Sequence, residues 1–187
     1  MAVLLLIVAA MVVWVIAAYN RLVSLRNQID NAWRQIDVQL KRRHDLIPNL
    51  VEAVKGYMQF ERDTLTQVVE ARAKAVSATD TASRMAAENQ ITAGMGKLLA
   101  VMENYPQLKS DQTVLKLQEE LTTTENQIAY SRQAYNDVVL DLNTRIQSFP
   151  SNMIATNFGF KPADYFKGAA EDAAVPKVDL GMSAPRA

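Results

Sequence analysis

The sequence predicts an all-α protein in which an N-terminal transmembrane helix is followed by an elongated antiparallel helical bundle of three long helices and a short fourth segment. Three observations favour this fold class. Residues 1–18 are apolar and uncharged. In the rest of the chain, apolar residues recur every three or four positions, which is typical of amphipathic helices. No stretch alternates apolar and polar residues as a half-buried strand would.

Residues 1–18 are long enough to cross a bilayer as a helix. At 1.5 Å per residue they span about 27 Å, close to the ~30 Å hydrocarbon core of a membrane. Trp14 and Tyr19 suit the aromatic belt at a membrane–water interface. The alternatives are a cleaved signal peptide and a buried core helix. An uncleaved anchor is preferred, because no basic segment precedes the apolar run and the cleavage site after Ala18 is a poor match.

The charges that flank this segment predict its orientation. Arg21, Arg26 and Arg34 follow it, whereas the N-terminal side offers only the amino group. The positive-inside rule then places the N-terminus outside and residues 20–187 in the cytoplasm, as a single-pass protein of the inner membrane. The chain has no cysteine, which excludes disulfides, thiol catalysis and thiolate metal sites and fits a cytoplasmic body.

The first helix of the body is predicted over residues 19–78. Its apolar stripe continues from Leu22 to Val76, and Pro48 is the only residue that interrupts it. Proline lacks an amide donor and clashes with the preceding turn, so it either kinks the helix or restarts it. Because no glycine turn accompanies Pro48, a kink is preferred. The resulting rod is about 90 Å long and continuous with the membrane helix.

Two further long helices and a short segment complete the expected bundle. A helix over 80–104 would begin at Thr79 or Asp80, and a helix over 111–148 would begin at Ser110 or Asp111. The second of these has nearly strict heptads with a polar step at Thr124. A short apolar segment, 153–166, is expected to plug one end of the bundle. The domain organisation is thus an anchor over 1–18, a bundle over 19–167 and a disordered tail over 168–187.

The sequence offers no pattern typical of catalysis. It contains one histidine, His44, which lies on the apolar stripe and is better explained as a packed or capping residue than as a catalytic one. No phosphate loop, nucleophile elbow or zinc-binding motif is present in the sequence. We therefore expect no enzyme, no catalytic or metal-binding residue and no cofactor. Twenty acidic and twenty basic residues cancel, so bulk charge does not favour nucleic-acid binding.

Aromatic and arginine side chains are the candidates for an interaction surface, because these residue types dominate interface hot spots. One group lies on the predicted first helix and the other on the short final segment. The candidates are Trp33, Arg34, Arg43, Tyr57, Phe158, Phe160, Tyr165 and Phe166.

Several contiguous blocks resemble a known family. They are Tyr19–Val23, Ala32–Trp33, Ile36–Val51, Glu125–Asp137, Phe149–Asn152 and Phe158–Phe160. In these blocks the chain is similar to the LemA family, and the resemblance covers about residues 1–167. It implies a single N-terminal membrane helix, a very short outside segment and a helical-bundle body. It supplies no catalytic residues.

The resemblance also leads to two hypotheses for the function. LemA-like relatives include a magnetosome protein linked to membrane shaping, and members are often encoded beside a membrane zinc metalloprotease. The first hypothesis is a non-enzymatic, membrane-anchored scaffold that self-associates to organise or shape the membrane, with membrane lipid and a second copy as partners. The alternative is an adaptor or regulator of a membrane metalloprotease in envelope stress or protein quality control. An exposed apolar stripe along 25–69 would favour the scaffold, and an exposed patch near 153–166 the adaptor.

Overall fold

The computed structural model describes residues 1–58 and 60–166. Five α-helices and one short 3₁₀ helix make up this part of the chain: α1 (Ala2–Lys55), α2 (Arg62–Ser77), α3 (Thr81–Met102), η1 (Leu108–Ser110), α4 (Gln112–Gln147) and α5 (Ser151–Asn157). No strand occurs in the described residues. The prediction of an all-α fold with a long N-terminal helix is confirmed.

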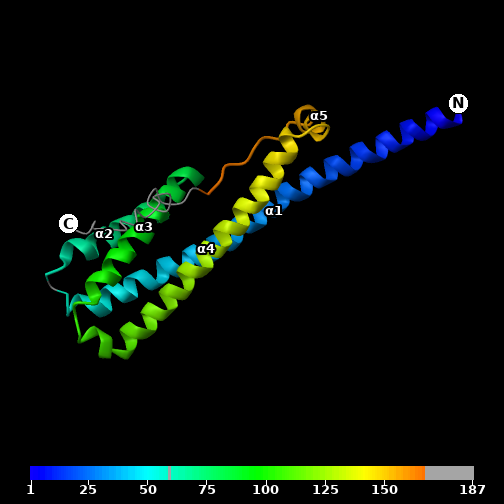
Figure 1. The fold of residues 1–187 in the computed structure, drawn as a ribbon. Coiled ribbons are helices and arrows are strands. Elements are labelled where there is room, and N and C mark those ends of the chain that lie inside the picture. The colour runs from blue at the N-terminus through cyan, green and yellow to red at the C-terminus, as the bar shows by residue number, and fades with distance from the viewer. Residues whose placement is uncertain (59, 167–187) are drawn as a thin grey trace, which may run out of the picture.

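The bundle is elongated because its two longest helices lie side by side. α1 and α4 are antiparallel neighbours, and the α2–α3 hairpin packs at the end where α1 finishes (Figure 1). α5 lies at the opposite end of α4, beside the middle of α1. Beyond α5, the N-terminal part of α1 continues alone, without a neighbouring helix (Figure 1).

The apolar core consists of two clusters along this axis. The distal core, at the end where α1 finishes, joins α1, α2, α3 and the start of α4. The proximal core, nearer the solitary part of α1, joins α1 to the end of α4, to α5 and to Phe166. The apolar stripe of α1 is buried in both clusters, through Leu22, Leu25, Ile29, Ile36, Leu40, Ile47, Leu50 and Val54.

The solitary part of α1 fits a membrane anchor. It is apolar, and its large side chains from Val3 to Val13 are more than half exposed. One helix in the described part of the chain is long and apolar enough to cross a membrane, and its apolar window lies near the N-terminus with no buried residue. Exposure of so many contiguous apolar side chains is unfavourable in water and favourable in lipid.

The prediction that one helix, kinked at Pro48, covers residues 19–78 is wrong in its extent. α1 continues through Pro48 and ends at Lys55, and the chain then turns back into α2, which begins at Arg62. The turn begins where the amides of Tyr57 and Met58 donate to the Val54 carbonyl at 2.9 and 3.0 Å. Met58 is fully buried, so the turn also closes the distal core.

Pro48 is tolerated because another helix replaces the hydrogen bond that it removes. Within an α-helix the amide of residue 48 would donate to the carbonyl of His44, and proline has no such amide. Arg72 of α2 donates from Nε to that carbonyl at 2.6 Å. The missing bond of α1 is thereby replaced by a charge-assisted contact between α1 and α2.

The remaining helix boundaries lie close to those predicted. Asp80 caps α3 by accepting from the Ser83 amide at 2.8 Å, and Asp111 caps α4 by accepting from the amides of Thr113 and Val114. Both residues were among the predicted N-caps. The heptad pattern of α4 is confirmed by its buried residues, which include Thr124.

The short fourth segment differs from its prediction. Only Ser151–Asn157 is helical, and residues 160–166 are extended. Gly159 adopts a φ of 71°, and the amides of Gly159 and Phe160 donate to the carbonyls of Thr156 and Ala155. This is the pattern of a glycine-terminated helix end, in which the left-handed residue reverses the chain. The predicted disordered tail, 168–187, lies outside the described residues.

We predict that Arg72→Ala destabilises the protein by about 1.5–3 kcal/mol, because it leaves the His44 carbonyl without a donor. In the Pro48→Ala background the new amide can bond this carbonyl, so the same substitution should cost less. A double-mutant cycle, measured by urea unfolding of the detergent-solubilised chain, should give a coupling energy above about 0.5 kcal/mol.

Lys74→Ala is the matched control, because Lys74 lies on the same helix and is exposed. It should be nearly neutral in both backgrounds. If Arg72→Ala lowers the free energy of unfolding equally with and without the Pro48→Ala substitution, Arg72 does not replace the hydrogen bond that proline removes.

Candidate functional site

Arg43 is the centre of a buried polar network in the bundle. Its side chain is only 1% exposed. The guanidinium contacts Glu88 Oε2 of α3 and Glu125 Oε2 of α4, both at 2.5 Å. It also donates to Thr92 Oγ1 at 2.9 Å. One side chain of α1 thus joins two other helices.

His44 extends the network from the next position of α1. Its Nε2 lies 2.9 Å from Glu88 Oε1. Glu88 has no exposed surface, so both of its carboxylate oxygens face basic side chains inside the protein. Thr92 is a further link between Arg43 and Glu125, because its hydroxyl lies 2.8 Å from Glu125 Oε1 and accepts from the Arg43 guanidinium. The prediction that His44 is a packed histidine is confirmed.

The network keeps Glu88 ionised. Burial is the largest influence on its pKa and would raise it, because a buried carboxylate loses its hydration. The hydrogen bond from His44 and the charge of Arg43 act in the opposite direction and together hold the pKa of Glu88 below its ordinary value. The carboxylate is therefore a structural counter-ion.

The arrangement of the network indicates a structural role. The charged side chains are paired with one another across α1, α3 and α4, and Arg43, His44 and Glu88 are all buried. No group of three or more His, Cys, Asp or Glu within the described ranges is placed to hold a metal ion. The cluster is thus suited to fixing how the helices pack against one another.

Two of the predicted interface residues are not on the surface. Arg43 is buried in the network, and Phe166 is buried in the proximal core. Their prediction as surface contacts is wrong, because Arg43 faces carboxylates of α3 and α4 while the Phe166 ring lies beneath the Arg132 guanidinium at 4.3 Å. Arg34, Tyr57, Phe158 and Tyr165 are exposed, and their role in an interface stays a prediction.

Trp33 is half-buried and packs inside the monomer. Its ring centroid lies 5.7 Å from that of Tyr135 in α4 and 6.0 Å from that of Phe166. The aromatic cluster predicted as a plug therefore divides into two places. Phe166 meets Trp33 near the middle of the bundle, whereas Phe158 and Phe160 meet Tyr19, at 4.9 and 5.7 Å between centroids.

The residues that hold the extended segment 160–166, here called the strap, were not predicted from the sequence. Asn143 bonds the amide and carbonyl of Ala163, both at 2.9 Å. Asn136 bonds the amide and carbonyl of Phe166 in the same way, at 2.8 and 3.0 Å. The sequence gives one signal for them, because two asparagines seven residues apart lie on one face of the predicted helix.

The distal end of the bundle has an open groove between α1 and α2. Its volume is about 900 Å³. Apolar residues form its floor, namely Val51, Met58, Leu65 and Val69. Charged residues of both signs line its sides, namely Glu52, Lys55, Arg62 and Glu70. We call this the distal groove.

Comparison with known proteins gives one family and several relatives. The LemA family profile matches residues 32–180. The protein LemA of Metamycoplasma hominis is 27% identical over 165 residues, which cover 88% of this chain and 74% of that protein. The magnetosome protein MamQ 2 of Paramagnetospirillum magneticum is 24% identical, covering 86% and 68%. The magnetosome protein MamQ of Magnetospirillum gryphiswaldense is 21% identical, covering 89% and 71%.

We predict that Glu88→Ala destabilises the protein by about 3–5 kcal/mol, because removing one partner of a buried ion pair leaves the other charge uncompensated. The control is Glu120→Ala. Glu120 lies 3.9 Å from Arg42 in an exposed pair, so its loss should cost less than about 1 kcal/mol. Urea unfolding followed by far-UV circular dichroism measures both values. Similar costs for the two variants would contradict the structural role of the network.

The depressed pKa of Glu88 predicts acid sensitivity. A carboxyl whose folded pKa lies below its unfolded value contributes stability that is fully present above the unfolded pKa and lost as pH falls through the folded one. The excess stability of the native protein over Glu88→Gln should therefore be constant above the ordinary value of 4.5 and shrink below it. Unfolding free energies measured across this pH range test the effect. If the stability of the native protein relative to Glu88→Gln grows as the pH falls, the lowered pKa of Glu88 is contradicted.

Proposed function

Because this chain belongs to the LemA family, we propose that it is a membrane-anchored, non-enzymatic scaffold whose helical body self-associates to organise or shape the membrane. The observation that supports a scaffold most is the continuity of α1. This single helix of 54 residues contains the exposed apolar stretch in its N-terminal part and contributes to both cores with the rest of its length. Such a helix transmits the position of the anchor to the body without a flexible joint.

Membrane attachment rests on the apolar stretch and on the family. Residues 1–18 contain no charged side chain, and the first charged side chain after them is that of Arg21. Family membership and the similarity to magnetosome proteins also support a protein that works at a membrane. We place the N-terminus outside and the body in the cytoplasm, in the inner membrane, because Arg21, Arg26 and Arg34 lie on the body side.

The distal groove is the surface that we assign to self-association. The apolar stripe of α1 is covered by α4 and the α2–α3 hairpin, so the exposed stripe that favoured a scaffold is absent over most of 25–58. The distal groove remains open, with an apolar floor and two acidic and two basic side chains on its sides. Two-fold symmetry pairs a surface with itself, and a surface that contains both signs of charge suits such pairing. The predicted interface residue Tyr57 lies in the same α1–α2 turn region.

The alternative is an adaptor or regulator of a membrane metalloprotease. The exposed patch near 153–166 that would favour this function is present, because Met153, Phe158 and Tyr165 are exposed. The distal groove, with its apolar and charged lining, could equally accept a segment of a different protein. The two functions differ in whether the purified protein is an oligomer.

We predict that the full-length protein forms a defined oligomer in detergent or nanodiscs. Val69→Lys should shift its mass towards the monomer, because Val69 is 44% exposed and lines the distal groove. Val76→Lys is the matched control, since Val76 is 61% exposed on the same helix but does not line the groove. Light scattering coupled to size-exclusion chromatography measures the mass, and circular dichroism confirms that the variants keep their helix content.

A monomer under all conditions would overturn the scaffold and favour the adaptor. An oligomer that both variants leave intact would place the self-association surface elsewhere.

A further inference from the structure

We propose that the α4–α5 hairpin is a second membrane contact, which inserts Phe149, Met153 and Phe158 into the interfacial region of the bilayer beside the anchor. The inference rests on the proposed membrane anchoring of residues 1–18 and extends it to a surface of the folded body. The occupant of this surface is the lipid bilayer.

The position of the hairpin along α1 is the first argument. A groove of about 350 Å³ is lined jointly by Trp14, Ala17 and Ala18 of α1 and by Pro150 and Ser151 of the hairpin. Trp14 precedes Tyr19 by five residues, so the hairpin reaches about 7 Å past Tyr19 towards the N-terminus. If residues 1–18 lie in the bilayer, the hairpin lies at the depth of residues 14–18 and contacts the lipid there.

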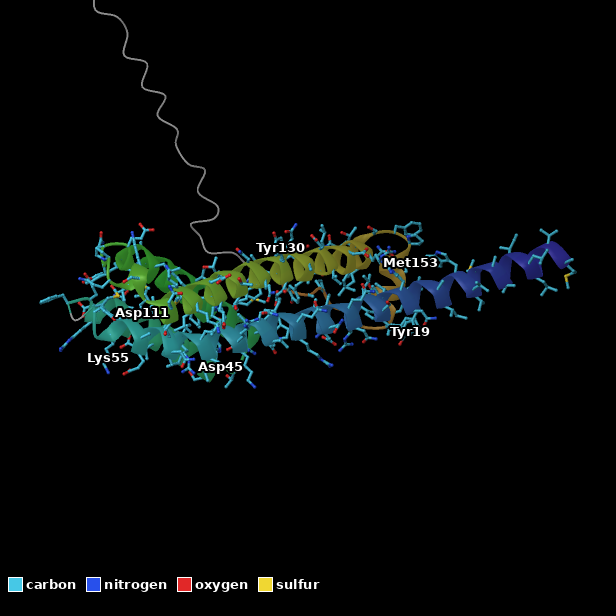
Figure 2. The ribbon with its side chains drawn as sticks, turned by 90° about the horizontal axis from the view of Figure 1, so that it is seen from below. Tyr19, Asp45, Lys55, Asp111, Tyr130 and Met153 are labelled. Carbon is cyan, nitrogen blue, oxygen red and sulfur yellow. The ribbon has the colours of Figure 1, made fainter. Side chains whose placement is uncertain are left out.

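Contacts between aromatic rings independently place the hairpin at the same position along α1. Phe158 and Phe160 lie against Tyr19, with centroids 4.9 and 5.7 Å apart. Figure 2 shows Met153 and Tyr19 at the same point along the molecule, where α1 leaves the bundle. Trp14, Tyr19 and Phe158 therefore cluster where an aromatic belt is expected.

Three large apolar side chains of the hairpin are exposed. Phe149 is 80% exposed, Met153 58% and Phe158 59%. The hairpin contributes Ile154 and Ala155 to the proximal core, whereas these three stay outside it, beside exposed polar but uncharged residues such as Gln147 and Asn157. No large apolar residue of α4 or α5 is as exposed as Phe149, which lies between the two helices.

The charge distribution matches an interfacial segment. No charged residue occurs between Arg145 and Lys161, an interval that contains the end of α4, the turn and the whole of α5. Asp141, the nearest acidic residue before it, contacts both Arg21 at 3.0 Å and Arg145 at 2.8 Å. Two basic side chains thus face one acidic side chain beside the hairpin, which suits a position next to lipid phosphates.

A site-directed fluorescence experiment on the full chain tests the proposal. The native protein has no cysteine, so single cysteines can be placed and labelled without altering any other site. Three variants are reconstituted in phosphatidylcholine vesicles that contain nitroxide-labelled lipid: Met153→Cys on the hairpin, Ala10→Cys in the anchor and Tyr130→Cys on α4. Tyr130 is 75% exposed and lies about 25 Å along α4 from its end, so it is the matched aqueous reference.

We expect the label at position 153 to be quenched several-fold more strongly than the label at 130, and most strongly by nitroxides near the headgroup. Adding Phe149→Asn and Phe158→Asn to the Met153→Cys variant should reduce this quenching, because insertion depends on the apolar side chains and not only on the nearby anchor.

Three results would overturn the proposal. Quenching at position 153 equal to that at 130, with position 10 quenched, would leave the anchor in place and remove the second contact. A label at 153 that is shielded from water but not quenched by lipid would mean that protein, such as a second copy, covers the hairpin. Absence of quenching at position 10 would remove the anchor and, with it, the second contact.

Discussion

The packing of this protein depends on two adjacent residues of α1, Arg43 and His44. Their side chains contact Glu88 of α3, and Arg43 also reaches Glu125 of α4. The His44 carbonyl accepts from Arg72 of α2. All four long helices therefore meet at one step of α1. A buried charge is costly unless its partners are all in place, so the network opposes any sliding of one helix against another.

That constraint determines what lies at the two ends of the bundle. α1 and α4 are antiparallel and are joined at Arg43 and Glu125. With their relative position fixed there, the end of α4 is placed beside residues 14–22 of α1. The strap then returns along α4, where Asn143 and Asn136 bond its backbone. The hairpin therefore reaches the level of Trp14 because of contacts made far from it.

Periodicity in the sequence was enough to predict the fold class, the long α4 with its heptads and the capping aspartates. It failed where a local signal was outweighed by tertiary contacts. Pro48 was the only interruption that the sequence showed in the first helix and was predicted to kink it, yet Arg72, distant in sequence, supplies the donor that proline lacks. The true end was marked by Lys55 and Gly56, a basic last turn followed by glycine, which is a typical helix terminus. Arg43 was predicted as an interface residue instead of a buried one, because its carboxylate partners lie 45 and 82 residues away in the sequence.

The same difficulty applies to the surfaces. Phe149 continues the heptad spacing of α4 in the sequence, but α4 ends at Gln147 and Phe149 is exposed. A heptad position predicts burial only while the helix and its neighbour both continue. Beyond the end of α4 lie α5 and the apolar part of α1, and within the described residues the large side chains of α1 from Val3 to Val13 stay more than half exposed. An apolar residue placed there is exposed to water in the isolated chain and to lipid in a membrane.

Anchoring and self-association constrain one another geometrically. Copies inserted in one bilayer share the direction of α1, so a pair that uses the same surface on both partners must have its two-fold axis along the membrane normal. The distal groove lies about 50 Å along α1 from Tyr19 and is lined by residues of α1 and α2, so it lies at equal height in two copies that share one membrane. A hairpin that contacts lipid would also restrict rotation of the body about α1 and so limit the directions in which the groove can face. Self-association through the distal groove and the lipid contact of the hairpin are therefore compatible. The lipid contact lowers the entropic cost of orienting two copies for self-association.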